Sequence, residues 1–144
     1  LIPELKPASE IKASGEFDLY YQKLKGIVKI EVKAGRAIDR TNDKAPYHDR
    51  ALISTDASGL FDMNFQQMKP TCFDVVIMIG VWVDKFKYWL MTSSEMKANK
   101  YFSTGQHRGN KGYEGQIHIK TENIADFAKF EVSIEQLLAK IKKL

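Results

Sequence analysis

The feature that most constrains the fold is an almost uninterrupted apolar run, FDVVIMIGVWV, at residues 73–83. Such a run is too short to cross a bilayer, which takes about 20 apolar residues in a helix, so we expect no membrane partner. It is typical of a β-strand covered on both faces, because a strand with one wet face alternates polar and apolar side chains. The run therefore predicts a central strand, and FKYWLMTSS at residues 86–94 predicts its antiparallel partner.

A second strand is predicted by the segment GIVKIEVKAG at residues 26–35, in which apolar and charged residues alternate. One face carries Val28, Ile30 and Val32, and the other carries Ile27, Lys29, Glu31 and Lys33. The aromatic-rich segment 17–24 precedes it, and Lys25-Gly26 suits a tight turn. Together the two segments predict a β-hairpin.

The rest of the chain is less regular. Residues 1–14 suggest an irregular lead-in, and residues 35–70 suggest a long polar connection in which LFDMNFQQM (60–68) forms a short helix. The glycine-rich segment 101–115 is predicted to be a loop, and QIHIK (116–120) a brief strand. Ser133 is predicted to cap a final helix over 134–144, with Ile134, Leu137, Leu138 and Ile141 on its apolar face.

Length and composition set the broad class. A chain of 144 residues with 44% hydrophobic residues can close a single core, so we expect one domain over 1–144. The pattern of elements predicts an α/β (α+β) fold with a mixed β-sheet flanked by helices. Because the chain opens on Leu1 rather than Met, the sequence leaves open that a natural N-terminal segment precedes it.

Charge and cysteine content narrow the setting. The formal net charge of +4 suits an anionic partner such as nucleic acid. The single cysteine, Cys72, excludes an internal disulfide and argues against a cysteine-rich zinc site. A reducing compartment such as the cytoplasm is therefore expected.

Two acids on the predicted hairpin form a candidate metal site. Asp18 lies thirteen residues before Glu31, so the turn brings the two carboxylates towards each other on neighbouring strands. Paired carboxylates repel unless they share a proton, a cation or a basic neighbour, and their oxygens suit a hard ion such as Mg²⁺. The alternative is an ordinary surface ion pair between Glu31 and Lys33, which is worth about 0–1 kcal/mol.

Asp18 followed by Glu31-Val32-Lys33 at the end of an apolar strand resembles the motif of the PD-(D/E)XK nuclease superfamily, over residues 16–36. The resemblance implies a restriction-endonuclease-like fold in which Asp18 and Glu31 hold a catalytic Mg²⁺, helped by the main-chain carbonyl of Val32. It implies that Lys33 orients or deprotonates the attacking water. The residue before Asp18 is Phe17, where the motif has proline.

The same resemblance implies an activity. We expect a Mg²⁺-dependent endonuclease that cuts double-stranded DNA, as a type II restriction enzyme acting as a homodimer. The alternatives are a structure-specific resolvase or repair nuclease, and a non-catalytic nucleic-acid-binding module. A helical glutamate upstream of the site is common in the superfamily, and the sequence leaves open whether Glu10 or Glu16 serves.

Residues that could contact DNA are concentrated in the glycine-rich segment, and one follows the candidate site. Arginine pairs well with guanine, and asparagine or glutamine with adenine. The candidates are Arg36, Gln106, His107, Arg108, Asn110 and Lys111. Arg40 and Arg50 follow in the polar connection and could bind phosphates. The alternative is that they only keep this loop soluble.

Overall fold

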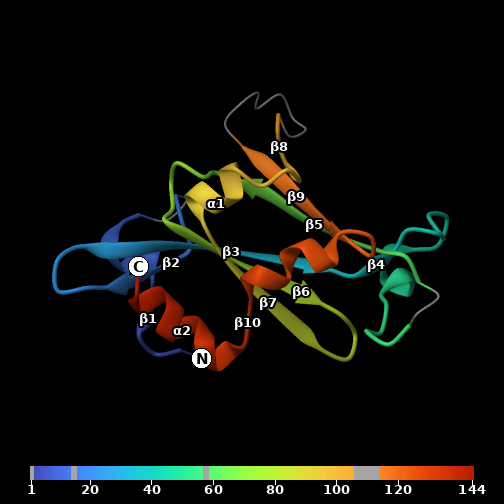
Figure 1. Cartoon of the computed structure of the whole chain (residues 1–144), viewed down its shortest axis with the longest axis horizontal. Coiled ribbons are helices and arrows are strands. Elements are labelled where there is room, and N and C mark those ends of the chain that lie inside the picture. The colour runs from blue at the N-terminus through green and yellow to red at the C-terminus, as the bar shows by residue number, and fades with distance from the viewer. Residues whose placement is uncertain (1, 14–15, 57–58, 106–113) are drawn as a thin grey trace.

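The computed structural model describes residues 2–13, 16–56, 59–105 and 114–144, and within them the chain forms an α+β fold with two sheets (Figure 1). The six-stranded sheet has the order β1 (Leu5–Pro7), β2 (Leu19–Gln22), β3 (Ile27–Arg36), β6 (Val75–Val81), β7 (Phe86–Thr92) and β10 (Glu131–Val132). The four-stranded sheet has the order β4 (Ile38–Asp39), β5 (Phe61–Met68), β9 (Gly115–Lys120) and β8 (Phe102–Thr104). The helices are α1 (Ser93–Lys97) and α2 (Ile134–Lys142), with 3-10 turns η1 (Ala8–Ile11), η2 (Tyr47–Arg50) and η3 (Ile124–Phe130).

The apolar run forms the central strand that the sequence predicts. β6 lies between β3, to which it is parallel, and β7, to which it is antiparallel, so the sheet is mixed. Val75, Val76, Ile77 and Met78 are buried in succession, on alternating faces of the sheet. The prediction of an α+β fold around a mixed sheet is confirmed.

The predicted hairpin is β2 and β3, with Leu19 opposite Ile30 and Gln22 opposite Ile27. The N–H of Lys23 donates to the carbonyl of Gly26 across the turn at 3.1 Å. Gly26 has φ of 84°, a left-handed conformation that glycine adopts without steric cost. The turn and the register therefore follow from the local sequence.

One face of the large sheet packs against α2. Val28 and Ile30 of β3 form a buried cluster with Leu137 and Ile141 of the helix. Ser133 caps α2 as predicted, since its hydroxyl accepts from the N–H of Gln136. Ile134, predicted on the apolar face, lies in the first turn of α2, outside the buried cluster, and is 44% exposed.

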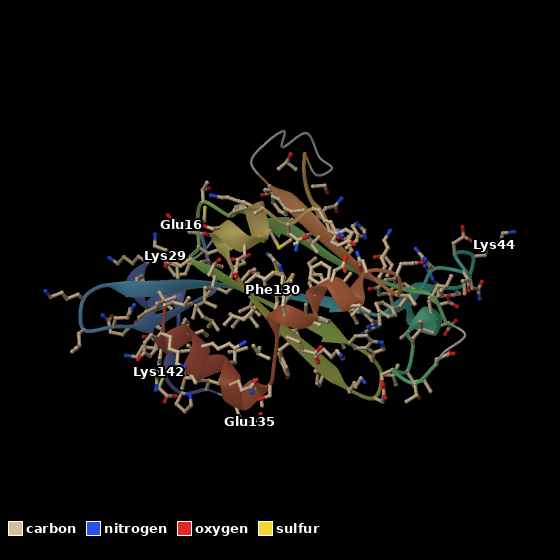
Figure 2. All side chains as sticks on the ribbon, in the orientation of Figure 1. Glu16, Lys29, Lys44, Phe130, Glu135 and Lys142 are labelled. Carbon is tan, nitrogen blue, oxygen red and sulfur yellow. The ribbon has the colours of Figure 1, made fainter. Side chains whose placement is uncertain are left out.

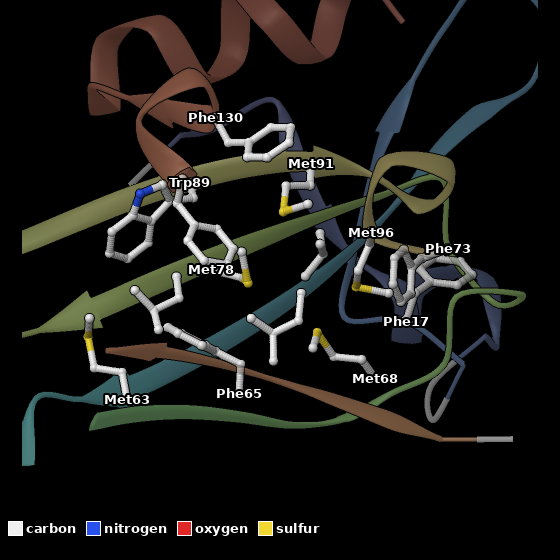
Figure 3. Packing of buried hydrophobic residues seen from close by; sticks show 14 of the residues in the cluster. Phe17, Met63, Phe65, Met68, Phe73, Met78, Trp89, Met91, Met96 and Phe130 are labelled. Atoms are coloured by element: carbon white, nitrogen blue, oxygen red, sulfur yellow. The ribbon is translucent and has the colours of Figure 1, made fainter. Parts of the chain in front are cut away.

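The other face is covered mainly by the second sheet, whereas the sequence predicted a mixed sheet flanked by helices. Figure 3 shows this core, in which Met63 and Phe65 of β5 lie opposite Met78 and Trp89 of the large sheet. Met96 of α1 and Phe127 and Phe130 of η3 complete it. The layers are thus α2, the large sheet, and the smaller sheet with α1 and η3.

The segment LFDMNFQQM is a strand, β5, and not a helix as predicted. Met63 and Phe65 are fully buried while Asp62, Asn64 and Gln66 alternate with them, which is the period of a strand. The polar connection also contains β4 and η2, and the lead-in contains β1 and η1. These short elements gain their order from pairing with distant strands, which local sequence does not reveal.

Charged side chains cover the outside of the fold. Figure 2 shows Lys44 extending from the loop before η2 and Glu135 and Lys142 from α2, while Phe130 lies inside. Among the described residues, none of the helices has both the length and the apolar character needed to cross a membrane.

Candidate active site

The three residues that carry the motif line one cavity of about 280 Å³. We call it the acidic cavity; it is lined by Glu16, Phe17, Asp18, Glu31, Lys33, Gln67, Lys69 and Glu114. Its walls come from the segment just before β2, the middle of β3, the end of β5 with the residue after it, and the residue just before β9. Asp18, Glu31 and Lys33 are therefore brought together on the same side of the large sheet.

Two hydrogen bonds hold Asp18 against β3, one to the residue before Glu31 and one from the residue after it. Its N–H donates to the carbonyl of Ile30 at 3.0 Å, and its Oδ2 accepts from the N–H of Val32 at 2.8 Å. Because β2 begins only at Leu19, the Val32 N–H has no β2 main-chain partner, and the Asp18 carboxylate accepts its hydrogen bond instead. The Val32 side chain packs in the cluster on the α2 face. The role expected for its carbonyl as a metal ligand stays a prediction.

Phe17 occupies the place of the motif's proline and anchors Asp18 by burial instead. Its ring is 4% exposed and belongs to the core cluster that also contains Phe73 and Met96 (Figure 3). Burying a phenylalanine side chain is worth about 1.5–3 kcal/mol, so the neighbouring aspartate is held at a defined point of the cavity wall.

Glu31 and Lys33 form a close ion pair on the cavity floor. Lys33 Nζ lies 2.6 Å from Glu31 Oε1, and Glu31 is only 7% exposed. Burial raises the pKa of Glu31 above its ordinary value of 4.5, and the charge of Asp18 adds to the rise, whereas Lys33 and Lys69 lower the pKa. A bound cation would offset the cost of holding the Glu31 carboxylate charged in this buried position.

Three cavity residues were missed by sequence reasoning: Gln67, Lys69 and Glu114. Gln67 has φ of 57°, and the pairing of β5 with β9 shifts register between Phe65 and Met68. This bulge interrupts the alternation of β5, and the signal for it was the pair of consecutive polar residues, Gln66-Gln67. Lys69 Nζ lies 3.5 Å from Glu114 Oε1, so a second ion pair borders the cavity.

The sequence left open which of two upstream glutamates, Glu10 or Glu16, belongs to the site, and the structure places them differently. Glu16 lines the acidic cavity, near the start of β2 (Figure 2). Glu10 lies in η1 and accepts a hydrogen bond from the Tyr20 hydroxyl at 3.3 Å. Glu16 is therefore the one placed to reach a ligand in the cavity.

The donor set fits a hard divalent cation held by few protein ligands. In the described part of the chain, no group of three or more His, Cys, Asp or Glu side chains is arranged to hold a metal ion. Asp18 and Glu31 nevertheless offer two carboxylates to one cavity. Mg²⁺ commonly takes one or two protein carboxylates and completes its shell with water and substrate phosphates. The two acids match that need.

The expected DNA-contact residues divide into two groups. Gln106, His107, Arg108, Asn110 and Lys111 lie outside the described residues. Arg36, at the end of β3, is exposed and lies outside the acidic cavity, with its guanidinium 5.8 Å from the ring centre of Tyr47. It lines a separate groove, together with Arg40 and Arg50.

Comparisons of the chain with protein-family models, with curated protein sequences and with solved structures found no match. The family resemblance therefore depends on the motif and on the positions of its side chains.

Proposed function

We propose that the chain is a Mg²⁺-dependent endonuclease of the PD-(D/E)XK type, with a restriction-endonuclease-like core, that hydrolyses phosphodiester bonds of double-stranded DNA. The observation that carries the proposal is the convergence of Asp18, Glu31 and Lys33 on one cavity. The 2.6 Å contact between Lys33 and Glu31 places an amine beside the predicted metal ligands. Asp18 also accepts a hydrogen bond from the Val32 N–H, so the proposal depends on both acids facing the same cavity as Lys33.

The roles of the residues follow from their positions. Asp18 and Glu31 would hold the cation, with Asp18 oriented by its hydrogen bond from Val32. The chemistry that a bound Mg²⁺ supplies is acidification of a water ligand and neutralisation of charge on the phosphate. Lys33 would orient the attacking water or, as a neutral amine, accept its proton. Lys69 would place a second positive charge near the non-bridging phosphate oxygens.

The test is cleavage of supercoiled plasmid in Mg²⁺ and in EDTA, by the wild type and by Glu31→Gln and Lys33→Ala. Matched controls come from the ion pair between Lys87 and Glu131, 3.0 Å apart on β7 and β10, far from the cavity in sequence. Lys87→Ala and Glu131→Gln should cut as the wild type does. Wild-type cleavage by purified, folded Glu31→Gln or Lys33→Ala would overturn the role assignment.

The products separate the proposed restriction enzyme from its alternatives. Discrete fragments favour sequence-specific cutting, for which a twofold homodimer would match a palindromic site. Preferential cutting of a four-way junction would favour a resolvase. Binding without cleavage in Mg²⁺ would favour the non-catalytic module.

A further inference from the structure

A second polar cavity, of about 360 Å³, lies beside the acidic cavity. We call it the arginine groove; its polar walls are Arg36, Arg40, Tyr47, Arg50, Asp62, Asn64, Gln66 and His118. It is built from the end of β3, the following segment through η2, and the face of β5 and β9 that points away from the core. Nothing in the proposed cleavage chemistry uses it.

The floor of the groove is a polar two-stranded ribbon. Met63 and Phe65 of β5 are fully buried, so the residues between them present their side chains to the opposite face. The register pairs Asn64 with His118 and Asp62 with Lys120. The outward ribbon therefore consists of Asp62, Asn64 and Gln66 on β5 and Gln116, His118 and Lys120 on β9.

The ribbon carries hydrogen-bonding groups that are held in place but not all satisfied. His118 Nδ1 lies 2.8 Å from Asp62 Oδ1, so Nε2 is the ring nitrogen that remains for a ligand. The amide oxygen of Asn64 is buried and has no hydrogen-bond partner within the described chain. Leaving a buried polar atom unpaired is unfavourable, and such atoms in native structures call for a reason. Because this oxygen has almost no accessible surface, a ligand would pair with it only after the Asn64 amide turned toward the groove.

Arginines border the ribbon on one side. Arg40 is paired with Glu122. Arg50 Nε donates to the main-chain carbonyl of Asp39 at 2.8 Å, and Arg36 lies over the Tyr47 ring. Within the described residues, neither Arg36 nor Arg50 forms an ion pair with a carboxylate, so both can receive an anionic ligand.

The groove and the acidic cavity share two strands. On β5, Gln66 lines the groove and the next residue, Gln67, lines the acidic cavity. On β3, Lys33 belongs to the cavity and Ala34 to the groove. The strand from Glu31 to Arg36 spans about 16 Å at the usual rise, which is about five base pairs of DNA.

Resting on the nuclease function proposed above, we propose that the outward face of β5 and β9 reads base edges in the major groove of duplex DNA. Asn64, Gln66 and His118 would contact the bases, and Arg36 and Arg50 the flanking phosphates. The major groove admits a two-stranded β-ribbon, and asparagine and glutamine pair with adenine there. Since Glu31 and Arg36 are about 16 Å apart along β3, the bases that the ribbon contacts would lie within about five base pairs of the bond that is cut.

The experiment separates reading from cutting by measuring binding in Ca²⁺ without Mg²⁺. Wild-type protein first selects from a randomised duplex library, and its affinity is then compared for the enriched duplex and a scrambled one. Asn64→Ala, Gln66→Ala and His118→Ala should each lower the ratio of the two affinities by about 5-fold or more, since a base contact discriminates by that much or better. Gln22→Ala, on β2 and outside both cavities, should leave the ratio unchanged.

Arginine variants test the second half of the proposal. Arg36→Ala and Arg50→Ala should weaken binding to the enriched and scrambled duplexes alike, and each should reduce the slope of log affinity against log salt by about 1. Lys87→Ala serves as the control for loss of one positive charge. A change in sequence preference without a change in salt slope would overturn the phosphate role.

The outcomes distinguish this proposal from the proposed function. If the wild type cuts at defined sites and all three ribbon variants keep the same preference, the ribbon proposal fails while the nuclease proposal stands. If the ribbon variants lose preference but no protein cuts in Mg²⁺, base reading by the ribbon stands, whereas the nuclease proposal and the stated distance to the bond cut fail. Preference for an RNA duplex of the same sequence would also overturn the ribbon proposal, because side chains cannot read its narrow major groove.

Discussion

The acidic cavity and the arginine groove lie on the same two strands but carry opposite charge. The cavity has four carboxylates against two ammonium groups, whereas the groove has three guanidinium groups against one carboxylate, Asp62. The cavity is a place for a cation and the groove a place for an anion. Adjacent regions of opposite charge can hold a metal ion and a phosphate chain together, which one uniformly basic surface could not do.

Asp18→Asn, in the acidic cavity, is expected to have the largest effect, which is on plasmid cleavage. The amide oxygen can still accept from the Val32 N–H, so the fold should survive, but one of the two anionic ligands is lost. We expect plasmid cleavage to fall by about 10²–10⁴-fold, the range over which single catalytic groups act. Initial rates of nicking in Mg²⁺ measure it, and circular dichroism controls for folding. A rate within a few fold of the wild type would remove Asp18 from the site.

Mg²⁺ should stabilise the protein through the cavity and not through the groove. A ligand that binds only the folded state at ten times its dissociation constant adds about 1.4 kcal/mol, or about 3–5 °C in Tm for a chain of this size. Thermal melts with and without Mg²⁺ should show this rise in the wild type and in Arg36→Ala, and lose it in Glu31→Gln. An equal rise in all three proteins would mean that the ion binds elsewhere.

Glu31→Gln should make the metal-free protein more stable at neutral pH. Because burial raises the pKa of Glu31 above 4.5, the folded protein holds this proton more tightly than the unfolded chain does. Ionisation of Glu31 therefore costs stability as the pH rises from about 4.5 through the folded pKa.

The substitution removes that cost, and we expect a gain of about 1 kcal/mol at pH 7, typical of replacing an unfavourable functional residue. Urea unfolding in EDTA between pH 4 and pH 8 measures it, a range that begins just below the ordinary glutamate pKa. Glu131→Gln, at an exposed ion pair, provides the control. A gain that persists unchanged below the ordinary glutamate pKa would show that ionisation is not its cause.

The smallest effect is expected at the bulge between the two regions. Gln67 has φ of 57°, which costs a side-chain-bearing residue about 1 kcal/mol relative to glycine. Gln67→Gly should therefore raise the free energy of unfolding by about 0.5–1 kcal/mol, while cleavage declines because the cavity loses a lining side chain. Urea unfolding and plasmid nicking on the same preparation test both. A loss of stability would show that the Gln67 side chain makes contacts worth more than the strain.

The local pattern predicted the hairpin, the central strand and the position of the candidate site. The alternation around Glu31 and the turn at Gly26 place Asp18, Glu31 and Lys33 within a short stretch of chain, so their convergence depends on few long-range contacts. Lys69 and Glu114 could not be found in this way. They reach the cavity only through the pairing of β5 with β9.

The mistaken helix over residues 60–68 has the same origin. A short segment with few turn residues fits a helix or a strand nearly as well, and burial against the large sheet decided for the strand. Once β5 is a strand, its polar residues form the floor of the arginine groove, which no motif in the sequence marked.

The sequence by itself determined the elements whose hydrogen bonds and side-chain contacts are local: the hairpin with its acids and lysine, the continuous apolar strand, and the capped final helix. Only the tertiary structure decided that a second sheet covers the large one, that Gln67 lies at a bulge, and that arginines gather beside a polar ribbon. The physical reason is that strand pairing joins residues far apart in the chain, so neither partner carries enough local information to specify the other.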